Sequence, residues 1–243
     1  MQGWGLTDPG CVRKQNQDAY RIEQLDRGAL ICVVCDGMGG AKSGNIASTL
    51  ASEVFVEEVR RSWKTGMEQD QIDQMLRSAV KLANFTVYDQ AVQFEEFEGM
   101  GTTLVAALIR GKTATVVNVG DSRCYAIDGD GISQVSKDHS LVQLMVDRGD
   151  LTPETAKTYP GKNLITRAIG TEPIVMCDLF HREMNKGDFL LLCSDGLSNM
   201  MDDQEILFEV VHGVNKKQCC KRLLNIAVGR GAPDNVTSVL VLV

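Results

Sequence analysis

Three apolar runs of this sequence end on an aspartate beside a glycine. They are Leu30 to Cys35 before Asp36-Gly37, Val116 to Val119 before Gly120-Asp121, and Phe189 to Ser194 before Asp195-Gly196. Runs this apolar are typical of central strands, so each is expected to deliver a carboxylate to the edge of the core. A single Asp-Gly pair usually marks a turn after a strand. Its recurrence after three such runs favours a functional cluster.

Carboxylates gathered at one edge of a core need a partner of opposite charge. Two of them about 4 Å apart repel by several kcal/mol at an effective dielectric near 20, and partial burial adds a desolvation cost. A divalent cation removes both penalties. Carboxylate and carbonyl oxygens suit Mg²⁺ or Mn²⁺, whereas zinc prefers the Cys and His side chains that do not accompany these aspartates.

Helices are predicted where apolar residues recur at three- and four-residue spacing. In residues 42–62, Ile46, Leu50 and Val54 run beside Ala47, Ala51 and Phe55, and residues 70–94 carry a longer pattern of the same kind. A third helix is expected from Cys219 to Val228, with Gly229 as its stop signal.

Nine strands are predicted as apolar or alternating runs between Gly and Asp residues. They are 3–7, 19–24, 29–35, 102–110, 113–119, 122–127, 175–182, 188–194 and 236–242. Strands joined by the short connections 111–112 and 120–121 are expected to pair antiparallel, because a parallel return needs about a dozen residues. The predicted fold is therefore α+β, a four-layer α-β-β-α sandwich of two antiparallel sheets flanked by long helices.

Residues 137–170 are polar and irregular, with one short amphipathic stretch from Leu141 to Arg148. We expect them to form a surface flap. No repeat or Pro-rich linker divides the chain, so residues 1–243 are predicted to be one catalytic domain that carries this flap.

The motifs and their order resemble the type 2C, metal-dependent serine/threonine protein phosphatases (PPM family), in their bacterial form. The resemblance runs from about residue 5 to the end of the chain. It rests on Thr7-Asp8-x-Gly10-x-Val12-Arg13-x-x-Asn16-Gln17-Asp18-x-Tyr20, Asp36-Gly37-Met38-Gly39-Gly40, Gly99-Met100-Gly101-Thr102-Thr103, Asn118-Val119-Gly120-Asp121-Ser122-Arg123, Asp138-His139-Ser140, Thr166-Arg167-Ala168-Ile169-Gly170, Ser194-Asp195-Gly196-Leu197 and Asp234-Asn235-Val236-Thr237.

The resemblance implies a metal and a phosphate role for particular residues. Asp36 is similar to the carboxylate that bridges two metals, with the Gly37 carbonyl on one and Asp195 and Asp234 on the other. Asp18 resembles the acid that reaches the metals through water, and Asp121, with Asp195 again, resembles the ligands of a weaker third metal. Arg13 is similar to the family's phosphate-binding arginine, whose planar fork matches two phosphoryl oxygens.

The implied activity is hydrolysis of phosphoserine and phosphothreonine on proteins. Two Mn²⁺ or Mg²⁺ ions would activate a water that attacks phosphorus in one step, without a phosphoenzyme. The expected partners are phosphoproteins and the bacterial serine/threonine kinase that acts on them, and a monomer is expected. Two positions depart from the pattern: Met38 stands where animal members have a His proposed as general acid, and Gln17 replaces a frequent Glu.

Composition sets the class of partner and the compartment. A net charge of −7 without clustered Lys and Arg argues against a nucleic-acid surface. The apolar runs are too short for a membrane helix, and the first residues lack the features of a secretory signal, so a cytoplasmic protein is expected. The eight cysteines are predicted to be small core or boundary residues rather than disulfides or zinc ligands. Cys32 and Cys35, three apart in one strand, should face opposite sides.

Two alternatives stay open at this point. Gly120-Asp121-Ser122 matches the nucleophile motif of Gly-Asp-Ser lipases, with Asp178 and His181 at the spacing of their acid and base, but that interpretation leaves Asp36, Asp195 and Asp234 unexplained. The second alternative is a catalytically weak homologue that only binds phosphoproteins. His139 is interpreted as a structural hydrogen-bonding residue, and His181 and His212 as solvated or boundary residues.

Overall fold

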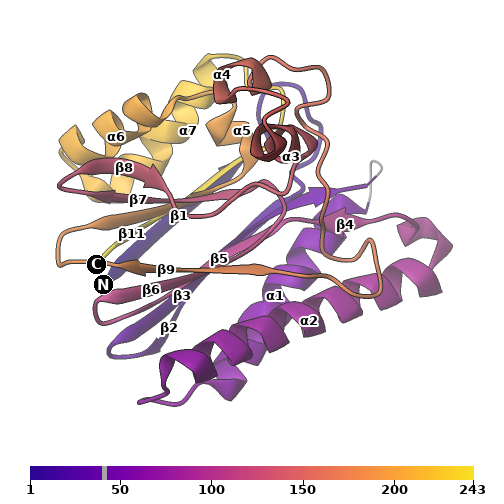
Figure 1. Ribbon diagram of the computed structural model, residues 1–243, viewed down its shortest axis with the longest axis horizontal. Helices are drawn as coiled ribbons and strands as arrows, with labels where there is room; N and C mark the ends of the chain where they lie inside the picture. Colours follow the sequence, from indigo (N-terminus) through magenta and orange to yellow (C-terminus); the bar gives the residue numbers. More distant parts are fainter. Residues whose placement is uncertain (40–42) are drawn as a thin grey trace.

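Strands of two antiparallel sheets form the centre of the computed structural model, which describes residues 1–39 and 43–243 (Figure 1). The first sheet has the order β1-β11-β10-β7-β8, and the second the order β2-β3-β5-β6-β9 with β4 paired to β3. Their bounds are β1 Gln2–Asp8, β2 Asp18–Asp26, β3 Ala29–Met38, β4 Gly101–Thr102, β5 Leu104–Arg110, β6 Thr113–Val119, β7 Arg123–Asp128, β8 Gly131–Gln134, β9 Asp178–Glu183, β10 Phe189–Cys193 and β11 Val236–Leu242.

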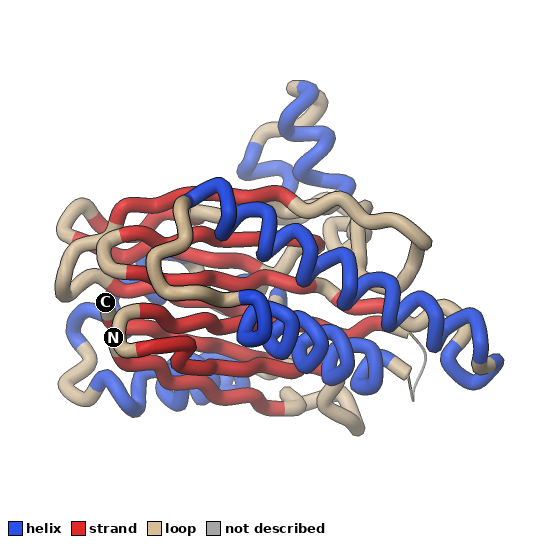
Figure 2. Tube along the Cα trace, turned by 90° about the horizontal axis from the view of Figure 1, so that it is seen from below, coloured by secondary structure: helices blue, strands red, loops and turns tan. Residues whose placement is uncertain are grey.

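Helices cover the outer face of each sheet. The long helices α1 (Gly44–Ser62) and α2 (Gln69–Gln93) lie across the second sheet, as Figure 2 shows. The first sheet is covered by α5 (Asp195–Ser198), α6 (Asp203–His212) and α7 (Cys219–Gly229). The predicted α-β-β-α sandwich is confirmed. Gly40 of the Asp36-to-Gly40 motif and residue 42, the predicted start of the first helix, lie outside the described residues.

The central strands are apolar on both faces because each face meets a different layer. In β3, Ile31, Val33 and Cys35 pack against α1 and α2, while the alternate residues Leu30, Cys32 and Val34 pack between the two sheets. The predicted opposite orientation of Cys32 and Cys35 is thereby confirmed. In β10, Leu191 and Leu192 divide in the same way between the α6–α7 layer and the space between the sheets.

The prediction that the strands before and after residues 120–121 pair with each other is wrong. β6 pairs with β5 and β9, whereas β7 belongs to the other sheet and pairs with β10 and β8. The chain crosses between the sheets at Gly120, whose φ of +106° lies in the left-handed region that glycine adopts without strain. The crossing leaves the next residue, Asp121, at the boundary between the two sheets.

The region predicted to be the flap, residues 137–170, carries two short helices, α3 (Leu141–Arg148) and α4 (Pro153–Ala156). Helix α6 was not predicted, although its capping box of Asp202 and Glu205 is readable in the sequence.

All eight cysteines are free thiols, and seven are buried, but Cys11 is exposed, which corrects its interpretation as a core or boundary residue. Within the described ranges, the helices are all too short or too polar to cross a bilayer.

Candidate active site

A cleft of about 900 Å³ opens at the end of the sandwich where β2, β3, β6, β10 and β11 bring their acidic residues. Most of the predicted site residues line it. They are Arg13, Asp36, Gly37, Asp121, Asp195 and Asp234. Asp18, the remaining one, lies opposite Asp36 in the β2–β3 register, deeper between the strands. Flap residues Asn163 and Ile165 form part of the cleft wall.

Asp36 sits near the end of β3 with its main chain fixed from both sides. Its N–H donates to Thr103 Oγ1 at 2.9 Å, and its carbonyl accepts from the Thr103 N–H at 2.9 Å and from Thr102 Oγ1 at 2.8 Å. Burial, followed by the charges of Asp18 and Asp195, raises the pKa of Asp36 well above its usual range. A carboxyl in this position is costly to ionise unless a cation is beside it.

The carboxylate of the half-buried Asp18 has one oxygen that is hydrogen-bonded and one that is not. Oδ2 accepts from Thr237 Oγ1 at 2.6 Å and from Ser194 Oγ at 2.8 Å. Oδ1 is buried without a hydrogen-bond partner among the residues described. Burial raises the pKa of Asp18 to about 7, against the opposing effect of the two hydroxyl groups. An orphaned carboxylate oxygen beside Asp36 is what a cation or its bound water would satisfy.

Asp195 begins α5, and only Ser194 separates it from the end of β10. Its Oδ2 accepts from the side-chain amide of Asn199, one turn along, at 3.0 Å. Burial and then the charge of Asp234 raise the pKa of Asp195, while a hydrogen bond with the Asp36 carboxyl opposes that rise. Asp36 and Asp195, 159 residues apart in numbering, thus lie close enough for each to shift the pKa of the other.

Asp234 precedes β11 and meets the N-terminal loop. Arg13 Nη2 donates to Asp234 Oδ2 at 2.8 Å. Asn235 holds that loop in place, because its side-chain amide donates to the carbonyls of Pro9 and Gln15 and its Oδ1 accepts from the Gln17 N–H. The pKa of Arg13 is raised by its hydrogen bond to Asp234, so the guanidinium stays charged.

Asp121 follows the chain crossing after β6. Burial, and then the charge of Asp195, raise its pKa to about 7. Asp121 therefore lies in the same electrostatic field as the other acids, and the structure brings all five predicted aspartates to one end of the sandwich.

The donor set fits a hard divalent cation in kind. All the side chains concerned are carboxylates. One of them, Asp18, has an oxygen without a hydrogen-bond partner among the described residues, and the main chain of Gly37 lines the same cleft. A Cβ at Gly37 would stand 2.1 Å from the Gly44 carbonyl oxygen, so only glycine fits there. In the described part of the chain, no three His, Cys, Asp or Glu side chains are grouped closely enough to hold a metal ion. Asp234 is engaged by Arg13, and Asp18 by two hydroxyl groups.

The serine hydrolase alternative is not supported by the structure. Ser122 is buried, and its Oγ lies 2.7 Å from Thr103 Oγ1. His181 pairs with Asp73 at 3.0 Å rather than with Asp178. A buried serine that is bonded to a threonine hydroxyl is presented neither to a substrate nor to a base.

A second hollow, of about 810 Å³, lies over the outer faces of α1 and α2. It is lined by acids that are already neutralised. The pairs are Glu53 with Arg21, Glu57 with Arg60 and Glu58 with Arg61. Exposed ion pairs of this kind are common on helices and indicate no chemistry.

Several residues that shape the site received no individual role in the sequence analysis, although Ser194, Asn235 and Thr237 belong to the quoted motifs. Thr237, Ser194, Asn199 and Asn235 orient the aspartates or the loop that carries Arg13. Polar residues beside or within apolar strands, such as Thr237 in β11, are the sequence feature that could have indicated these roles. His139 is confirmed as a structural hydrogen-bonding residue: it is buried, and its ring bonds Gly120 and Asp178.

Comparison with known proteins assigns the family. The family model described as Protein phosphatase 2C matches residues 12–225. A putative protein phosphatase 2C-type of Streptococcus pyogenes serotype M6 is 36% identical over 237 residues, which cover 97% of this chain and 94% of that protein. The serine/threonine phosphatase stp of Listeria monocytogenes serovar 1/2a is 33% identical over 238 residues, with 97% and 93% covered.

Solved structures agree with this assignment. The serine/threonine phosphatase Stp1 from Staphylococcus aureus matches with a TM-score of 0.93 and 37% identity, over 100% of this chain and 94% of that one. The Mycobacterium tuberculosis serine/threonine phosphatase PstP/Ppp matches with a TM-score of 0.86 and 34% identity, over 98% and 97%. The chain belongs to the protein phosphatase 2C family.

Proposed function

We propose that this protein is a serine/threonine protein phosphatase that depends on Mn²⁺ or Mg²⁺. One observation carries the proposal: five aspartates from separate segments meet at a single cleft, and the Arg13 guanidinium lies among them. The family is metal-dependent, and its bacterial relatives carry the name serine/threonine phosphatase. Phosphoproteins are therefore the substrate class.

The residues proposed to hold the cations are Asp36, the Gly37 carbonyl, Asp195 and Asp234, with Asp18 acting through water and Asp121 at a further site. When bound, such cations lower the pKa of a coordinated water towards neutrality and offset charge on the phosphoryl oxygens. The high pKa values of Asp36 and Asp195 support this assignment, because burial has made both carboxyls receptive to positive charge.

Arg13 is proposed to hold the phosphate group. Its side chain is 55% exposed and lines the cleft, and its guanidinium donates to Asp234 through Nη2. A planar fork can engage two phosphoryl oxygens at once, which orients phosphorus towards the acids. The acidic protein thereby supplies a local positive charge for an anionic substrate.

Asp18 and its hydroxyl partners are proposed to keep a water in place. Ser194 and Thr237 both donate to Oδ2, so Oδ1 is the oxygen left without a hydrogen-bond partner among the described residues. The reaction forms one phosphorus–oxygen bond from water and breaks the bond to the serine or threonine oxygen in a single displacement. No protein nucleophile is needed, and Ser122 is too buried to act as one.

The wider role proposed is to reverse phosphorylation by a bacterial serine/threonine kinase in the cytoplasm, with the enzyme acting as a monomer. Support comes from the bacterial origin of the matched relatives and from eight free thiols, which suit a reducing compartment.

The decisive experiment measures release of phosphate from a phosphothreonine peptide and a phosphotyrosine peptide, with Mn²⁺ and with chelator. We expect turnover of phosphothreonine only with the cation, and its loss in Asp195→Ala. Asp130→Ala, an exposed aspartate in the β7–β8 turn, is the matched control and should behave as wild type. Full activity of Asp195→Ala would overturn the mechanism. Tight phosphopeptide binding without turnover at saturating Mn²⁺ would instead identify the catalytically weak homologue.

A further inference from the structure

Asp121 lies in the short loop between β6 and β7, and both ends of this loop are held by consecutive residues of the flap. Gly120 precedes Asp121 and contacts His139, while Arg123 follows it and contacts Asp138. Asp138 and His139 lie at the start of the flap, residues 137–170. The chain on either side of one proposed cation ligand is thus clamped by the base of the flap.

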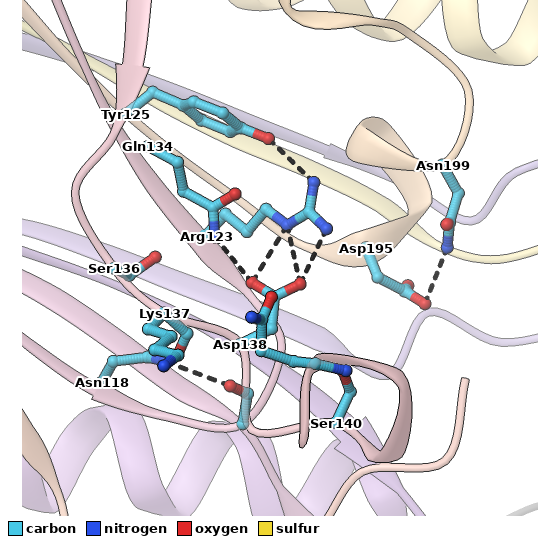
Figure 3. Close-up of polar contacts among 12 residues, drawn as sticks. Asn118, Arg123, Tyr125, Gln134, Ser136, Lys137, Asp138, Ser140, Asp195 and Asn199 are labelled. Atoms are coloured by element: carbon cyan, nitrogen blue, oxygen red, sulfur yellow. Dashed lines mark hydrogen bonds and ion pairs between the residues drawn. The ribbon is translucent and has the colours of Figure 1, made fainter. Parts of the chain in front are cut away.

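The first clamp is the ion pair of Arg123 with Asp138, drawn in Figure 3. Arg123 Nε lies 3.1 and 3.0 Å from the two oxygens of Asp138, and Nη2 lies 2.7 Å from Oδ2. Tyr125 Oη accepts from Arg123 Nη1, and Gln134 Nε2 donates to Asp138 Oδ1 at 2.7 Å. The Asp138 side chain is only 10% exposed, so this bidentate pair has a single well-defined geometry.

The second clamp joins His139 to Gly120 by main chain and ring. The His139 N–H donates to the Gly120 carbonyl at 2.9 Å, and the Gly120 N–H donates to His139 Nδ1 at 3.1 Å. Because Nδ1 accepts, Nε2 carries the proton and donates to Asp178 Oδ2 at 3.2 Å. Asn118 adds a bridge from its side-chain amide to the carbonyls of Gly120 and Lys137.

The far end of the flap reaches the same place. Asp178, the first residue of β9, accepts from His139 and, through Oδ1, from Arg167 Nη1 at 3.0 Å. His139 and Arg167, from the two ends of the flap, therefore meet at Asp178, and His139 also contacts Gly120 beside Asp121. The contacts form a connected network in which His139, Asn118 and Gly120 are buried, and its geometry is more restrictive than that of single surface bonds.

We propose that Asp138 and His139 are positioning residues for Asp121: the base of the flap fixes where the Asp121 carboxylate stands and so sets the cation affinity at that position. The inference rests on the proposed cation role of Asp121. Groups that orient a metal ligand commonly change metal affinity or activity by about 10- to 100-fold when they are removed. Neither residue needs to touch substrate.

A purely structural role predicts something different. A half-buried ion pair that only supports the fold lowers stability when broken and leaves the cation response unchanged. The chain offers a matched pair for comparison, Arg182 with Asp128, whose Nη2 and Oδ2 lie 2.7 Å apart at the opposite end of β7. Asp128→Asn therefore measures the cost of breaking such a pair away from the cleft.

The test titrates Mn²⁺ into wild type, Asp138→Asn and Asp128→Asn by calorimetry and, separately, follows phosphothreonine peptide turnover against Mn²⁺ concentration. In Asp138→Asn we expect the dissociation constant of the weakest Mn²⁺ site to rise by about tenfold, and the Mn²⁺ concentration at half-maximal rate to rise equally. We also expect kcat to be affected more than KM. In Asp128→Asn, the Mn²⁺ dissociation constant and the Mn²⁺ concentration at half-maximal rate should both stay within about twofold of the wild-type values. Gln134 is exposed, so Gln134→Ala should fold normally. It should raise the Mn²⁺ concentration at half-maximal rate, but by less than Asp138→Asn does.

A double-mutant cycle separates positioning from general damage. If Asp138 acts through Asp121, Asp138→Asn should have little further effect in a protein that already carries Asp121→Asn. There it should raise the Mn²⁺ concentration at half-maximal rate by less than about twofold. An equal shift in both backgrounds, or a wild-type calorimetric titration for Asp138→Asn, overturns the inference. Wild-type turnover that does not respond to Mn²⁺ would overturn the proposed function itself, so the two failures are distinguishable.

Discussion

Arg13 and Asp234, 221 residues apart in the chain, meet at the mouth of the cleft, where Nη2 donates to Oδ2 at 2.8 Å. The contact joins the residue proposed to hold phosphate to one proposed to hold a cation. It also explains how an acidic protein keeps a guanidinium in a fixed place, since Asn235 ties the loop of Arg13 to the residue beside Asp234.

Replacing Arg13 should weaken substrate binding more than cation binding. In Arg13→Ala, KM for a phosphothreonine peptide should rise by about 10- to 100-fold, because a hydrogen bond to a charged group contributes about 1.5–3 kcal/mol. Arg13→Lys keeps the positive charge but loses the planar guanidinium, so its KM should lie between those of the wild type and Arg13→Ala. Steady-state kinetics at saturating Mn²⁺ measures this. An unchanged KM in Arg13→Ala would show that another group holds the phosphate.

Cation binding should stabilise the fold through Asp36. Mn²⁺ at about 100 times its Kd adds about 2.7 kcal/mol to the free energy of unfolding of the wild type. Asp36→Asn should lose most of this gain, yet be at least as stable as wild type in chelator, because a buried like charge has been removed. Thermal unfolding with and without Mn²⁺ tests both halves. A full Mn²⁺ gain in Asp36→Asn would contradict the assignment.

Without cations, the stability of the wild type should fall as pH rises from about 4 to 7. Burial raises the pKa of Asp18 to about 7, above its unfolded value of 3.8. Across that window the folded protein binds more protons than the unfolded chain, so raising pH favours unfolding, and the slope ends above about pH 7. Urea unfolding in chelator at pH 5, 6 and 7.5 measures the slope, which Asp18→Asn should reduce. Equal slopes in the two proteins would refute this pH linkage.

Ser122 should be dispensable for the chemistry. Ser122→Ala removes a buried hydroxyl bonded to Thr103 and should retain phosphatase activity within about tenfold, at a cost of about 1–3 kcal/mol in unfolding free energy. Thr103→Val removes the other hydroxyl of that bond and also the acceptor of the Asp36 N–H, so it should cost more. Loss of all hydrolysis in a folded Ser122→Ala protein, together with activity in chelator, would revive the serine hydrolase alternative.

The long amphipathic helices and most strands were predictable because their signals are local. Alternate residues of β3 face α1 and α2 or the other sheet, and a strand buried on both sides must be apolar throughout. The same locality explains the error at residues 120–121: a two-residue connection predicts a hairpin, whereas the left-handed Gly120 and the buried Ser122 lead the chain across to the other sheet. Helix α6 was missed although its cap was readable.

By itself the sequence determined that carboxylates follow apolar strands, that their motifs resemble one family, and that Arg13 is available for an anion. Only the tertiary structure decided that Asp18 and Asp36 stand opposite each other, that Thr237 bonds Asp18, and that Asp138 and His139 flank the loop of Asp121. The physical reason is range: periodicity and turn chemistry act within a few residues, whereas these contacts join segments brought together when the two sheets pack.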